Sequence, residues 1–441
     1  PPRSTLFPYT TLFRSRQLTE GCLYVALRGE RFDGHAFVGQ ALAGGAAAAL
    51  VERGWQPPPG AEGWPLIRVD DTRAALRDAA RAWRLASGAF VLGLTGSSGK
   101  TTTKEMAAAL FAAAGEVCAT RGNLNNEIGL PLSLLEMPRT CAYGIFELGT
   151  NHPGEIAQLA DVLRPQAALV ASIGEAHIEH FGSVEAIARE KGELLRTLPP
   201  GGFAALSLET RCFDLLASLS AAPVVTVSLA SRDADFFGEL VDTLCGRVRI
   251  TERATGERTL VCSGLPGEHN ASNLLLAFAA ARRAGVPPQA AAQALLRLKL
   301  PGMRWEVTAR RGVTVVNDAY NANPGSMAAV LRTFMMLPCS GRRVVVLGDM
   351  LELGAHAEAL HREVGRHVAE LAPDLVFAVG QDTRAYVADE AVRRGYPPGQ
   401  IHLFDSPAQA AAALSEAVSA GDAVLLKASR GMRLERILDD L

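Results

Sequence analysis

Apolar and polar positions alternate along most of the chain in a way that predicts strands separated by helices. Three apolar runs have the length of a buried strand: 89–95, 143–148 and 167–173. Amphipathic stretches at 153–163 and 183–198 predict helices between and after them. The stretch 203–262 is rich in β-prone residues and turns, and a helix is predicted from 270 to 285. This order favours a parallel sheet with helices on both faces.

The last third of the chain repeats the same pattern. Five further apolar runs predict strands: 313–318, 342–349, 374–380, 401–405 and 422–428. Helical runs separate them, as in a doubly wound fold, where ligands bind beyond the carboxyl ends of the strands. Asp318, Asp349 and Lys427 stand at such ends. We therefore expect a polar site at this edge of the sheet.

These patterns predict an α/β protein of three domains. The expected domains are a small α/β domain at 15–88, a central P-loop ATPase-type parallel sheet at 89–299, and a Rossmann-like doubly wound domain at 300–441. A helix from 72 ends near Gly88, which marks the first boundary.

The first residues, PPRSTLFPYTTLFRS, follow neither a helix nor a strand pattern. They also lack the apolar core of a secretory signal. They resemble a translated sequencing adapter more than natural protein, so we interpret residues 1–14 as a non-native segment.

Composition narrows the classes of function. Of the 441 residues 48% are hydrophobic and 20% charged, with a formal net charge of −2. This balance is that of a globular protein without a global attraction to nucleic acid or to anionic lipid. The seven cysteines form no CxxC pair, which predicts reduced thiols and a cytoplasmic location. No apolar run reaches the roughly 18–20 residues of a membrane-spanning helix.

A glycine-rich loop after the strand at 89–95 is the most informative motif. It comprises Gly96, Ser97, Ser98, Gly99, Lys100, Thr101 and Thr102. Its backbone N–H groups and the helix that follows suit a phosphate, Lys100 suits the β- and γ-phosphates, and Thr101 offers a hydroxyl to Mg²⁺. Leu94 stands where the longer form of the motif has its first glycine. The alternative is a helix-capping turn with an exposed lysine, but the strand–loop–helix order favours ATP binding.

Several linked motifs resemble the Mur ligase family from about Ser15 onward. They are TGSSGKTTTKEM, RGNLNNEIGLPLSLL, FELGTNHPGEI, GEAHIEHFGSVEAIAREKGEL and DAYNANPGSM, in that order. The resemblance implies a UDP-substrate domain, an ATPase domain and an amine-substrate domain. It is most specific to members that join D-alanyl-D-alanine to UDP-N-acetylmuramoyl-tripeptide through an acyl phosphate. It also implies a monomer that uses ATP and two Mg²⁺ ions.

The resemblance also implies a metal centre. Thr101 and Glu147 are the implied ligands of one Mg²⁺ and His177 of a second, with His152 and His180 as alternatives. The family has at Lys191 a lysine that reacts with CO₂ to give a carbamate, an anion able to bridge metal ions. Otherwise Lys191 is an ordinary solvated helix lysine. Lys100, His177 and Lys191 are thus the predicted catalytic residues.

The remaining site residues are implied in the same way. Asn270, Arg304 and Asp318 are expected at ATP, and Ser15, Arg16, Asn123, Asn125, Asn126 and Glu127 at the UDP-substrate. Tyr320, Asn321, Asn323, Lys427, Ser429 and Arg430 are expected at the amine substrate, with Asp349, Glu352 and His361 as further candidates for that cleft. The amide-rich loop at 122–129 and the polar turn at 427–430 have a purely structural alternative, as turns held by local bonds.

The class of reaction keeps alternatives open. Another amino-acid-adding Mur ligase or a folylpolyglutamate synthase would show similar motifs, and a P-loop NTPase that drives a switch would share the phosphate loop. The third residue of the accepted peptide, diaminopimelate or lysine, is also open.

Overall fold

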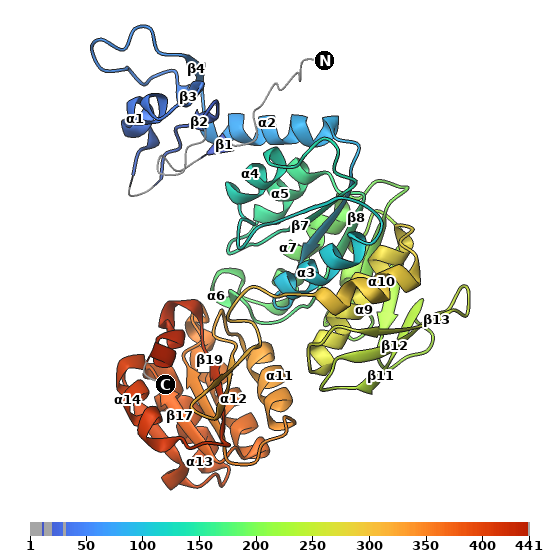
Figure 1. Ribbon diagram of the computed structural model, residues 1–441, viewed down its shortest axis with the longest axis vertical. Coiled ribbons are helices and arrows are strands. Elements are labelled where there is room, and N and C mark those ends of the chain that lie inside the picture. Colours follow the sequence, from blue (N-terminus) through green and yellow to red (C-terminus); the bar gives the residue numbers. More distant parts are fainter. Residues whose placement is uncertain (1–10, 13–19, 30–31, 440–441) are drawn as a thin grey trace. The chain divides into compact units, whose positions relative to one another are not determined.

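The computed structural model describes residues 11–12, 20–29 and 32–439, and its contacts divide the chain into two compact units (Figure 1). The first unit holds the described residues up to Gly93 together with Gly115–Thr150 and Gly154–Gln166. The second holds Leu94–Ala114, Asn151–Pro153 and the described residues from Ala167 onward.

The first unit begins with a parallel four-stranded sheet in the order β1-β2-β3-β4. Its strands are β1 Thr11–Leu12, β2 Leu23–Val25, β3 Ala48–Glu52 and β4 Leu66–Val69. A 3-10 turn η1 (Gly34–Phe37) and helix α1 (Val38–Ala43) connect β2 to β3. Buried Cys22, Tyr24, Val38 and Val51 belong to the core of this sheet. The strand β1 lies within the segment 1–14 that the sequence marks as non-native.

Helix α2 (Thr72–Ala86) packs on two other helices of the first unit, α4 (Gly129–Leu135) and α5 (Glu155–Leu163). Asp71 starts α2 by accepting hydrogen bonds from two backbone N–H groups of its first turn. Trp83 Nε1 donates to Met137 O at 2.9 Å, and buried Arg84 donates to Leu163 O at 3.0 Å. The amphipathic helix predicted from residue 72 is confirmed.

A nine-stranded sheet has the order β13-β12-β11-β10-β9-β8-β5-β7-β6. Its strands are β5 Phe90–Thr95, β6 Val117–Ala119, β7 Tyr143–Glu147, β8 Ala167–Val170, β9 Phe203–Ser207, β10 Val224–Ser228, β11 Phe236–Asp242, β12 Arg247–Glu252 and β13 Arg258–Cys262. Within the second unit β8, β9, β10 and β11 pair in parallel, and β11, β12 and β13 pair antiparallel. The β-rich stretch predicted at 203–262 is therefore confirmed.

Helices of the second unit flank this part of the sheet. They are α3 Lys100–Phe111, α6 Ile178–Phe181, α7 Val184–Arg196, α8 Phe213–Leu219, α9 Glu268–Arg283 and α10 Pro288–Ala294, with a 3-10 turn η2 Leu295–Arg297. Helix α9 packs on α3 and on β9, β10 and β11. Its middle, from Ala271 to Ala281, is almost entirely buried, which explains why that stretch is nearly all apolar.

A six-stranded sheet ends the chain, in the order β14-β15-β19-β16-β17-β18. Its strands are β14 Glu306–Arg310, β15 Val313–Asn317, β16 Arg343–Gly348, β17 Leu375–Val379, β18 Ile401–Phe404 and β19 Ala423–Lys427. The five predicted strands are confirmed as parallel partners. Strand β14 was not predicted, because it is an antiparallel edge strand without an apolar run.

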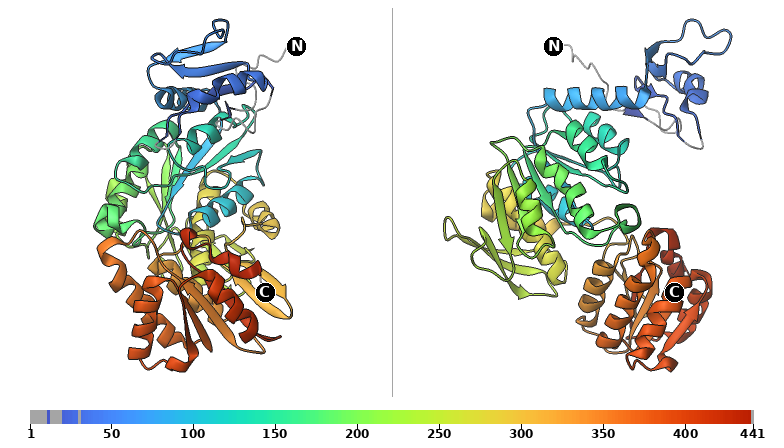
Figure 2. Two further views of the ribbon diagram at one scale, coloured as in Figure 1. Left: turned by 90° about the vertical axis from the view of Figure 1, so that its left-hand side faces the viewer. Right: turned by 180° about the vertical axis from the view of Figure 1, so that it is seen from behind.

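Helices cover both faces of this sheet (Figure 2). They are α11 Pro324–Met335, α12 Ala357–Leu371, α13 Ala388–Arg393 and α14 Pro407–Ala417, with short turns η3 Gly354–His356, η4 Thr383–Val387, η5 Pro398–Gln400, η6 Arg430–Met432 and η7 Leu434–Asp439. The chain passes from β15 through β16 and β17 to β18 in one direction across the sheet. The connection from β18 to β19 runs in the opposite direction. Right-handed crossovers then require α14 on the face opposite α11 and α12.

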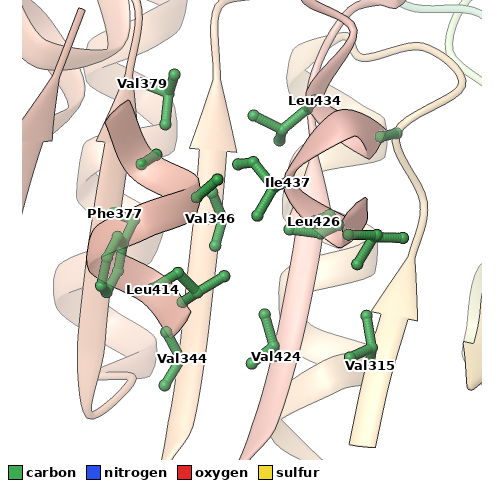
Figure 3. Close-up of a cluster of buried hydrophobic side chains, with 14 of the residues drawn as sticks. Val315, Val344, Val346, Phe377, Val379, Leu414, Val424, Leu426, Leu434 and Ile437 are labelled. Atoms are coloured by element: carbon green, nitrogen blue, oxygen red, sulfur yellow. The ribbon is translucent and has the colours of Figure 1, made fainter. Parts of the chain in front are cut away.

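The core beneath α14 illustrates this arrangement (Figure 3). Val346, Phe377 and Leu426 from three neighbouring strands pack with Leu414 of α14 and Ile437 of η7. All five side chains are at most 1% exposed. The alternate residues of each strand face α11 and α12, so the strands are apolar on both sides, as a central parallel sheet requires.

Within the part of the chain that the structure describes, no helix combines the length and the apolar character needed to span a membrane. All seven cysteines lie in this part, and each is a free thiol, as the sequence analysis predicts.

Replacing Leu426 by alanine is expected to destabilise the C-terminal sheet by about 2–5 kcal/mol, because it removes a fully buried side chain from a close-packed core. Urea unfolding measures the loss. Leu403→Ala is the matched control, since this leucine of β18 is 54% exposed. Equal losses in the two variants would contradict the packing described here.

Candidate functional site

The glycine-rich loop between β5 and α3 is bonded to the segment that follows β8. Ser97 N donates to Ser172 O at 2.8 Å, and Ser97 Oγ donates to Gly174 O at 2.9 Å. Ser98 N donates to Ser172 Oγ at 2.9 Å. The Ser98 hydroxyl also lies 3.0 Å from Ser172 Oγ, so both serine hydroxyls of the loop are bonded to one neighbouring segment.

The turn into α3 depends on Gly99. This residue has φ +77°, in the left-handed region that favours glycine, and a Cβ there would lie 2.7 Å from Asn273 Oδ1 of α9. Thr101 lies in the first turn of α3 and is buried. The N–H groups of this turn belong to a helix N-terminus, where an anion is favoured.

Three cationic or basic side chains of the second unit lie close enough to influence one another. The charge of Lys100 acts on both His177 and Lys191, and the charge of Lys191 acts on His177. Lys100 Nζ donates to Gly96 O at 2.8 Å, which folds its side chain back over the phosphate loop. The structure therefore brings the three predicted catalytic residues together.

Lys191 belongs to α7, and its side chain is buried, with 2% of the residue exposed. Burial, and to a lesser extent the neighbouring charge of Lys100, lower the pKa of Lys191 from 10.5 to about 7 against an opposing effect of Glu190. A neutral amine is the nucleophile that reacts with CO₂. The ordinary solvated lysine that the sequence left as an alternative does not describe this residue.

His177 precedes α6 and has a left-handed backbone, with φ +58°. Burial lowers the pKa of His177, and Lys100 and Lys191 act in the same direction, whereas Glu352 raises it. Nδ1 of His177 is hydrogen-bonded to Glu352 Oε2. The rings of the alternatives His152 and His180 contact one another at an interplanar angle of 37°, with centroids 4.4 Å apart.

The donors of the second unit fit a cation that arrives with a nucleotide. Among the residues that the structure describes, no group of three or more His, Cys, Asp and Glu side chains is arranged to hold a metal ion by itself. Mg²⁺ is commonly held by one or two protein donors together with substrate phosphates. Thr101 beside the phosphate loop suits that mode. His177 offers one nitrogen, so the hard oxygen donors of a second ion must come from elsewhere, and a carbamate on Lys191 is such a donor.

Glu147 lies in the first unit, at the end of β7, and is 2% exposed. Asn125 Nδ2 donates to Glu147 Oε1 at 2.8 Å, and Glu147 N donates to Thr120 Oγ1 at 2.9 Å. The carboxylate is therefore held in place by the amide-rich loop at 122–129.

Other members of that loop make local bonds. Asn126 Oδ1 accepts from Gly129 N at 2.9 Å and so caps α4, and Glu127 forms an ion pair with Arg73 at 3.8 Å. Asn123 O accepts from Asn125 N. Their predicted contact with a UDP-substrate stays a prediction.

Polar side chains of α9 and of the C-terminal sheet meet near the start of α9. Asn270 is buried and donates to Pro266 O at 2.8 Å. Burial lowers the pKa of His269 to about 4, and the nearby charges of Asp318 and Lys427 act on it in opposite directions. The sequence predicted Asn270 at ATP, but it did not indicate that His269 lies near Asp318 and Lys427.

Asp318 joins three chain segments. Its Oδ1 accepts from Trp305 N at 2.8 Å, and its Oδ2 accepts from Lys427 Nζ at 2.5 Å. Lys427 also donates to Asn321 O at 2.8 Å and is 4% exposed. The cation that the sequence assigns to a substrate carboxylate is thus engaged with Asp318, because their strands are neighbours in the sheet.

Arg304 lies over the ring of Tyr320, 3.8 Å from its centroid, and Arg304 Nε is buried without a hydrogen-bond partner. Met303 and Trp305 on either side have positive φ angles of 61° and 49°. An unsatisfied guanidinium nitrogen in a strained hinge is a candidate contact for an anionic ligand.

Three further predicted residues have defined places. Asn323 caps α11 and donates from Nδ2 to Ser97 O at 3.4 Å. Ser429 Oγ accepts from Leu351 N at 2.9 Å, and Arg430 forms an ion pair with Glu435 at 2.7 Å. Asn323 therefore lies at the phosphate loop, whereas Ser429 supports the loop after β16.

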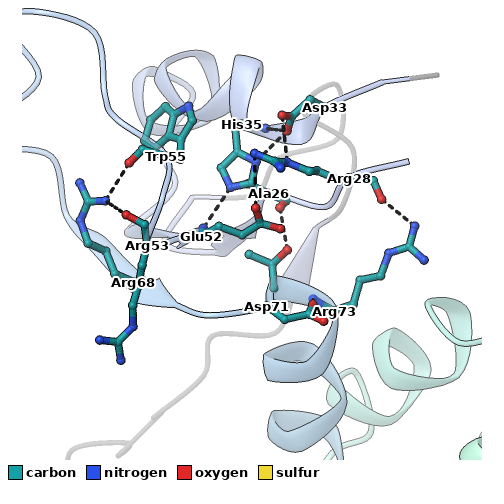
Figure 4. A network of polar contacts seen from close by, with 11 residues as sticks. Ala26, Arg28, Asp33, His35, Glu52, Arg53, Trp55, Arg68, Asp71 and Arg73 are labelled. Carbon is teal, nitrogen blue, oxygen red and sulfur yellow. Dashed lines mark hydrogen bonds and ion pairs between the residues drawn. The ribbon is translucent and has the colours of Figure 1, made fainter. Parts of the chain in front are cut away.

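The N-terminal sheet carries a polar network around the loop after β2 (Figure 4). His35 is 2% exposed, bonds to Asp33 through Nδ1 at 2.6 Å, and accepts from Glu52 N at 3.0 Å. Arg28 pairs with Asp33 and with Glu52. These bonds hold Asp33 and His35 against the end of β3. Ser15 and Arg16, predicted at the UDP-substrate, lie outside the described residues.

Sequence reasoning missed several residues that shape the site. Ser172 is hydrogen-bonded to the phosphate loop and Asn273 lies against Gly99, but neither belongs to a predicted motif, and only the tertiary structure reveals them. Glu352 was grouped with the amine cleft, whereas it contacts His177. Asp349 and His361 accept backbone hydrogen bonds and are buried.

Comparisons with known proteins agree with this geometry. Three family models match in chain order: Mur ligase family, catalytic domain, at residues 12–84; Mur ligase middle domain at 94–281; and Mur ligase, glutamate ligase domain, at 303–430. The chain belongs to the Mur ligase family.

Relatives of similar length share the match. A UDP-N-acetylmuramoyl-tripeptide–D-alanyl-D-alanine ligase of Bacillus subtilis is 36% identical over 97% of this chain and 92% of its own length. The ligase of the same name from Escherichia coli is 39% identical over 84% of this chain and 81% of its own.

Solved structures are similar as well. A crystal structure of MurF from Acinetobacter baumannii has a TM-score of 0.87 at 30% identity and covers 98% of this chain and 93% of that one. MurF from Thermotoga maritima in complex with ADP has a TM-score of 0.82 at 28% identity, with coverages of 98% and 96%. The predicted three-domain α/β fold class is confirmed.

The lowered pKa of Lys191 predicts a pH-dependent stability. Below about pH 7 the ammonium is charged in both states and its burial destabilises the fold in full; between pH 7 and 10.5 only the unfolded chain binds the proton, so stability rises with pH. Lys191→Met should therefore be more stable than the parent by the largest margin at or below pH 7, and the margin should shrink toward pH 10.5.

Urea unfolding in CO₂-free buffer measures this margin. Lys299→Met is the control, since Lys299 is exposed. A constant margin for Lys191→Met would show that Lys191 titrates like a solvated lysine.

Proposed function

We propose that this protein is an ATP-dependent ligase that joins D-alanyl-D-alanine to UDP-N-acetylmuramoyl-tripeptide in the synthesis of peptidoglycan precursors. One observation carries the proposal: a shaped phosphate loop brings Lys100 within electrostatic reach of both His177 and buried Lys191. The names of the Bacillus subtilis and Escherichia coli relatives supply the substrates.

ATP is the proposed nucleotide. The loop from Gly96 to Thr102 and the N-terminus of α3 are suited to its phosphates, and the Thermotoga maritima relative was solved with ADP. Arg304, whose Nε has no partner, and Asn270 are proposed to contact the nucleotide from the hinge and from α9.

The first step transfers a phosphoryl group. A carboxylate oxygen of the tripeptide attacks the γ-phosphorus of ATP, the bond from that phosphorus to the bridging oxygen breaks, and ADP leaves with the electron pair. Both reactants are anions and repel one another. Lys100 offsets this repulsion by its position at the phosphate loop, where its charge requires no reorganisation during the reaction.

The second step forms the amide. The amine nitrogen of D-alanyl-D-alanine attacks the acyl carbon, the amine loses a proton, and the tetrahedral intermediate expels inorganic phosphate. An acyl phosphate is readily hydrolysed, so water must be excluded. Asn323, which caps α11 and bonds to Ser97 O, is placed to keep the C-terminal sheet against the phosphate loop.

Two Mg²⁺ ions are proposed to accompany ATP, and when bound they would supply positive charge to the phosphates and the carboxylate. Thr101 and His177 are proposed ligands from the second unit, and Glu147 from the first by the family resemblance. A carbamate on Lys191 would add two hard oxygen donors and place a negative charge where the unmodified side chain carries an amine.

The remaining assignments are proposals of the same kind. Asn123, Asn125, Asn126 and Glu127 are proposed for the UDP-substrate, and Tyr320, Asn321, Ser429 and Arg430 for the amine. Lys427 is proposed to act through Asp318, to which it is paired. We further propose a monomer in the cytoplasm, with domains at 15–88, 89–299 and 300–441.

Phosphate release tests the proposed reaction. With ATP and UDP-N-acetylmuramoyl-tripeptide, release should depend on added D-alanyl-D-alanine and should yield the pentapeptide product by mass spectrometry. Lys100→Ala should lower the rate at least about 100-fold, because one preorganised charge at a developing anion is lost. Lys299→Met should act like the parent.

Two results would point elsewhere. ATP turnover that does not depend on an amine would favour an NTPase that drives a switch. Ligation of meso-diaminopimelate, L-lysine or glutamate in place of the dipeptide would favour a different amide ligase.

Carbon-13 NMR with labelled bicarbonate tests the carbamate. The parent and Lys299→Met should show a carbamate resonance that Lys191→Met lacks, because Lys191 is a buried amine whose pKa is lowered to about 7. Lys191→Ala should lose ligase activity and regain part of it with short-chain carboxylic acids. Full activity of Lys191→Ala without an added acid would rule out the carbamate.

A further inference from the structure

The loop that follows β16 carries Glu352 to His177, a contact that the reaction described above does not use. Glu352 Oε2 is bonded to His177 Nδ1, and Glu352 O accepts from Glu179 N at 3.5 Å. The contact therefore has a side-chain part and a backbone part. It joins η3 and α6, which also pack on one another.

The base of this loop is bonded to the segment after β17. The Asp349 carboxylate accepts from Gln381 N at 2.9 Å and from Thr383 N at 2.7 Å. Asp349 is 7% exposed, so these bonds are shielded from water. They fix the point at which the loop leaves the sheet.

The next two residues of the loop are bonded as well. Met350 N donates to His361 Nε2 at 3.0 Å, and Leu351 N donates to Ser429 Oγ at 2.9 Å. Two buried side chains from α12 and from the turn after β19 thus determine the path of the backbone to Glu352. The backbone that leads to Glu352 is therefore held by hydrogen bonds, although the Glu352 side chain itself is 47% exposed.

Both partners of the contact have an unusual backbone. His177 has φ +58° and Glu352 φ +64°, in the left-handed region that costs non-glycine residues energy. Gly354 has φ +54°, and a Cβ there would lie 2.7 Å from Glu179 Cβ. The absence of a side chain at Gly354 therefore allows η3 to approach α6 closely.

We propose that Glu352 is a positioning residue, whose carboxylate accepts a hydrogen bond from Nδ1 of His177 and leaves Nε2 as the nitrogen available to a divalent cation. The inference rests on the proposed function for the identity of that cation. A carboxylate bonded to one imidazole nitrogen fixes both the tautomer and the ring orientation for a metal on the other. Because Glu352 comes from the C-terminal sheet, His177 is oriented only when that sheet lies against α6.

An ordinary ion pair is the competing explanation. Exposed pairs contribute little and need no support. Here the His177 side chain is only 17% exposed, and the loop that carries Glu352 is bonded at each residue from Asp349 to Leu351. These backbone hydrogen bonds distinguish the Glu352–His177 contact from an incidental surface ion pair.

Nitrogen-15 NMR of the histidine side chains tests the orientation without any metal. The signals of His177 are identified by their loss in His177→Asn. The parent should show His177 with the proton on Nδ1, and Glu352→Gln should keep it because the amide oxygen also accepts. Glu352→Ala should show mixed tautomers. Glu358→Ala is the matched control, since Glu358 is exposed and pairs with Arg362.

Mn²⁺ binding in the presence of ADP gives the second readout. Glu352→Ala should weaken the affinity about 10-fold, the lower end of the range for lost support of a metal ligand, and Glu352→Gln should stay close to the parent. In a His177→Asn background, Glu352→Ala should cause no further loss. An additive loss would show that Glu352 does not act through His177.

An unchanged His177 tautomer together with unchanged Mn²⁺ affinity in folded Glu352→Ala would overturn the inference. Failure of the proposed function gives a different result. In that case the parent protein would hydrolyse ATP without ligation, but the His177 tautomer would still depend on Glu352. Thermal unfolding of each variant, compared with Glu358→Ala, separates loss of the fold from loss of orientation.

Discussion

The packing of the phosphate loop onto the segment after β8 is the constraint on which the rest of the site depends. The bonds of Ser97 and Ser98 to Ser172 and Gly174 give the loop one shape. The same segment continues to His177. The same hydrogen bonds therefore position both the phosphate-binding amides and a proposed metal ligand. A shift of the phosphate loop would therefore also move His177, and the reverse.

Electrostatics then gives this arrangement its chemical character. Lys100, His177 and Lys191 are close enough to disfavour one another's charged forms, and burial acts in the same direction. Without bound anions, the positive charges of such a site repel one another. Phosphates, a substrate carboxylate and a carbamate would each relieve the repulsion, which is why the cluster favours a reaction between two anions over a general binding role.

The sequence allowed most of the fold and part of the site to be predicted. Apolar runs of strand length and the glycine-rich loop are local signals, so β5, α3 and the five parallel strands of the C-terminal sheet could be found from them. The exposed edge strand β14 carries no such signal and was missed. Asp318 and Lys427 were both predicted at strand ends, but their mutual ion pair depends on β15 and β19 being neighbours, although they are more than 100 residues apart in the chain.

The sequence by itself determined which residues carry chemistry, because residue type, spacing and the strand–loop–helix order are written locally. Only the tertiary structure decided their partners and their protonation. The sequence around Lys191 does not distinguish it from an exposed helix lysine, and its burial in the folded chain is the main reason why the pKa of its amine falls to about 7. Glu352 likewise became a partner of His177 only through packing, since no pattern of 3.6 or 2 residues relates two positions that meet across separate sheets.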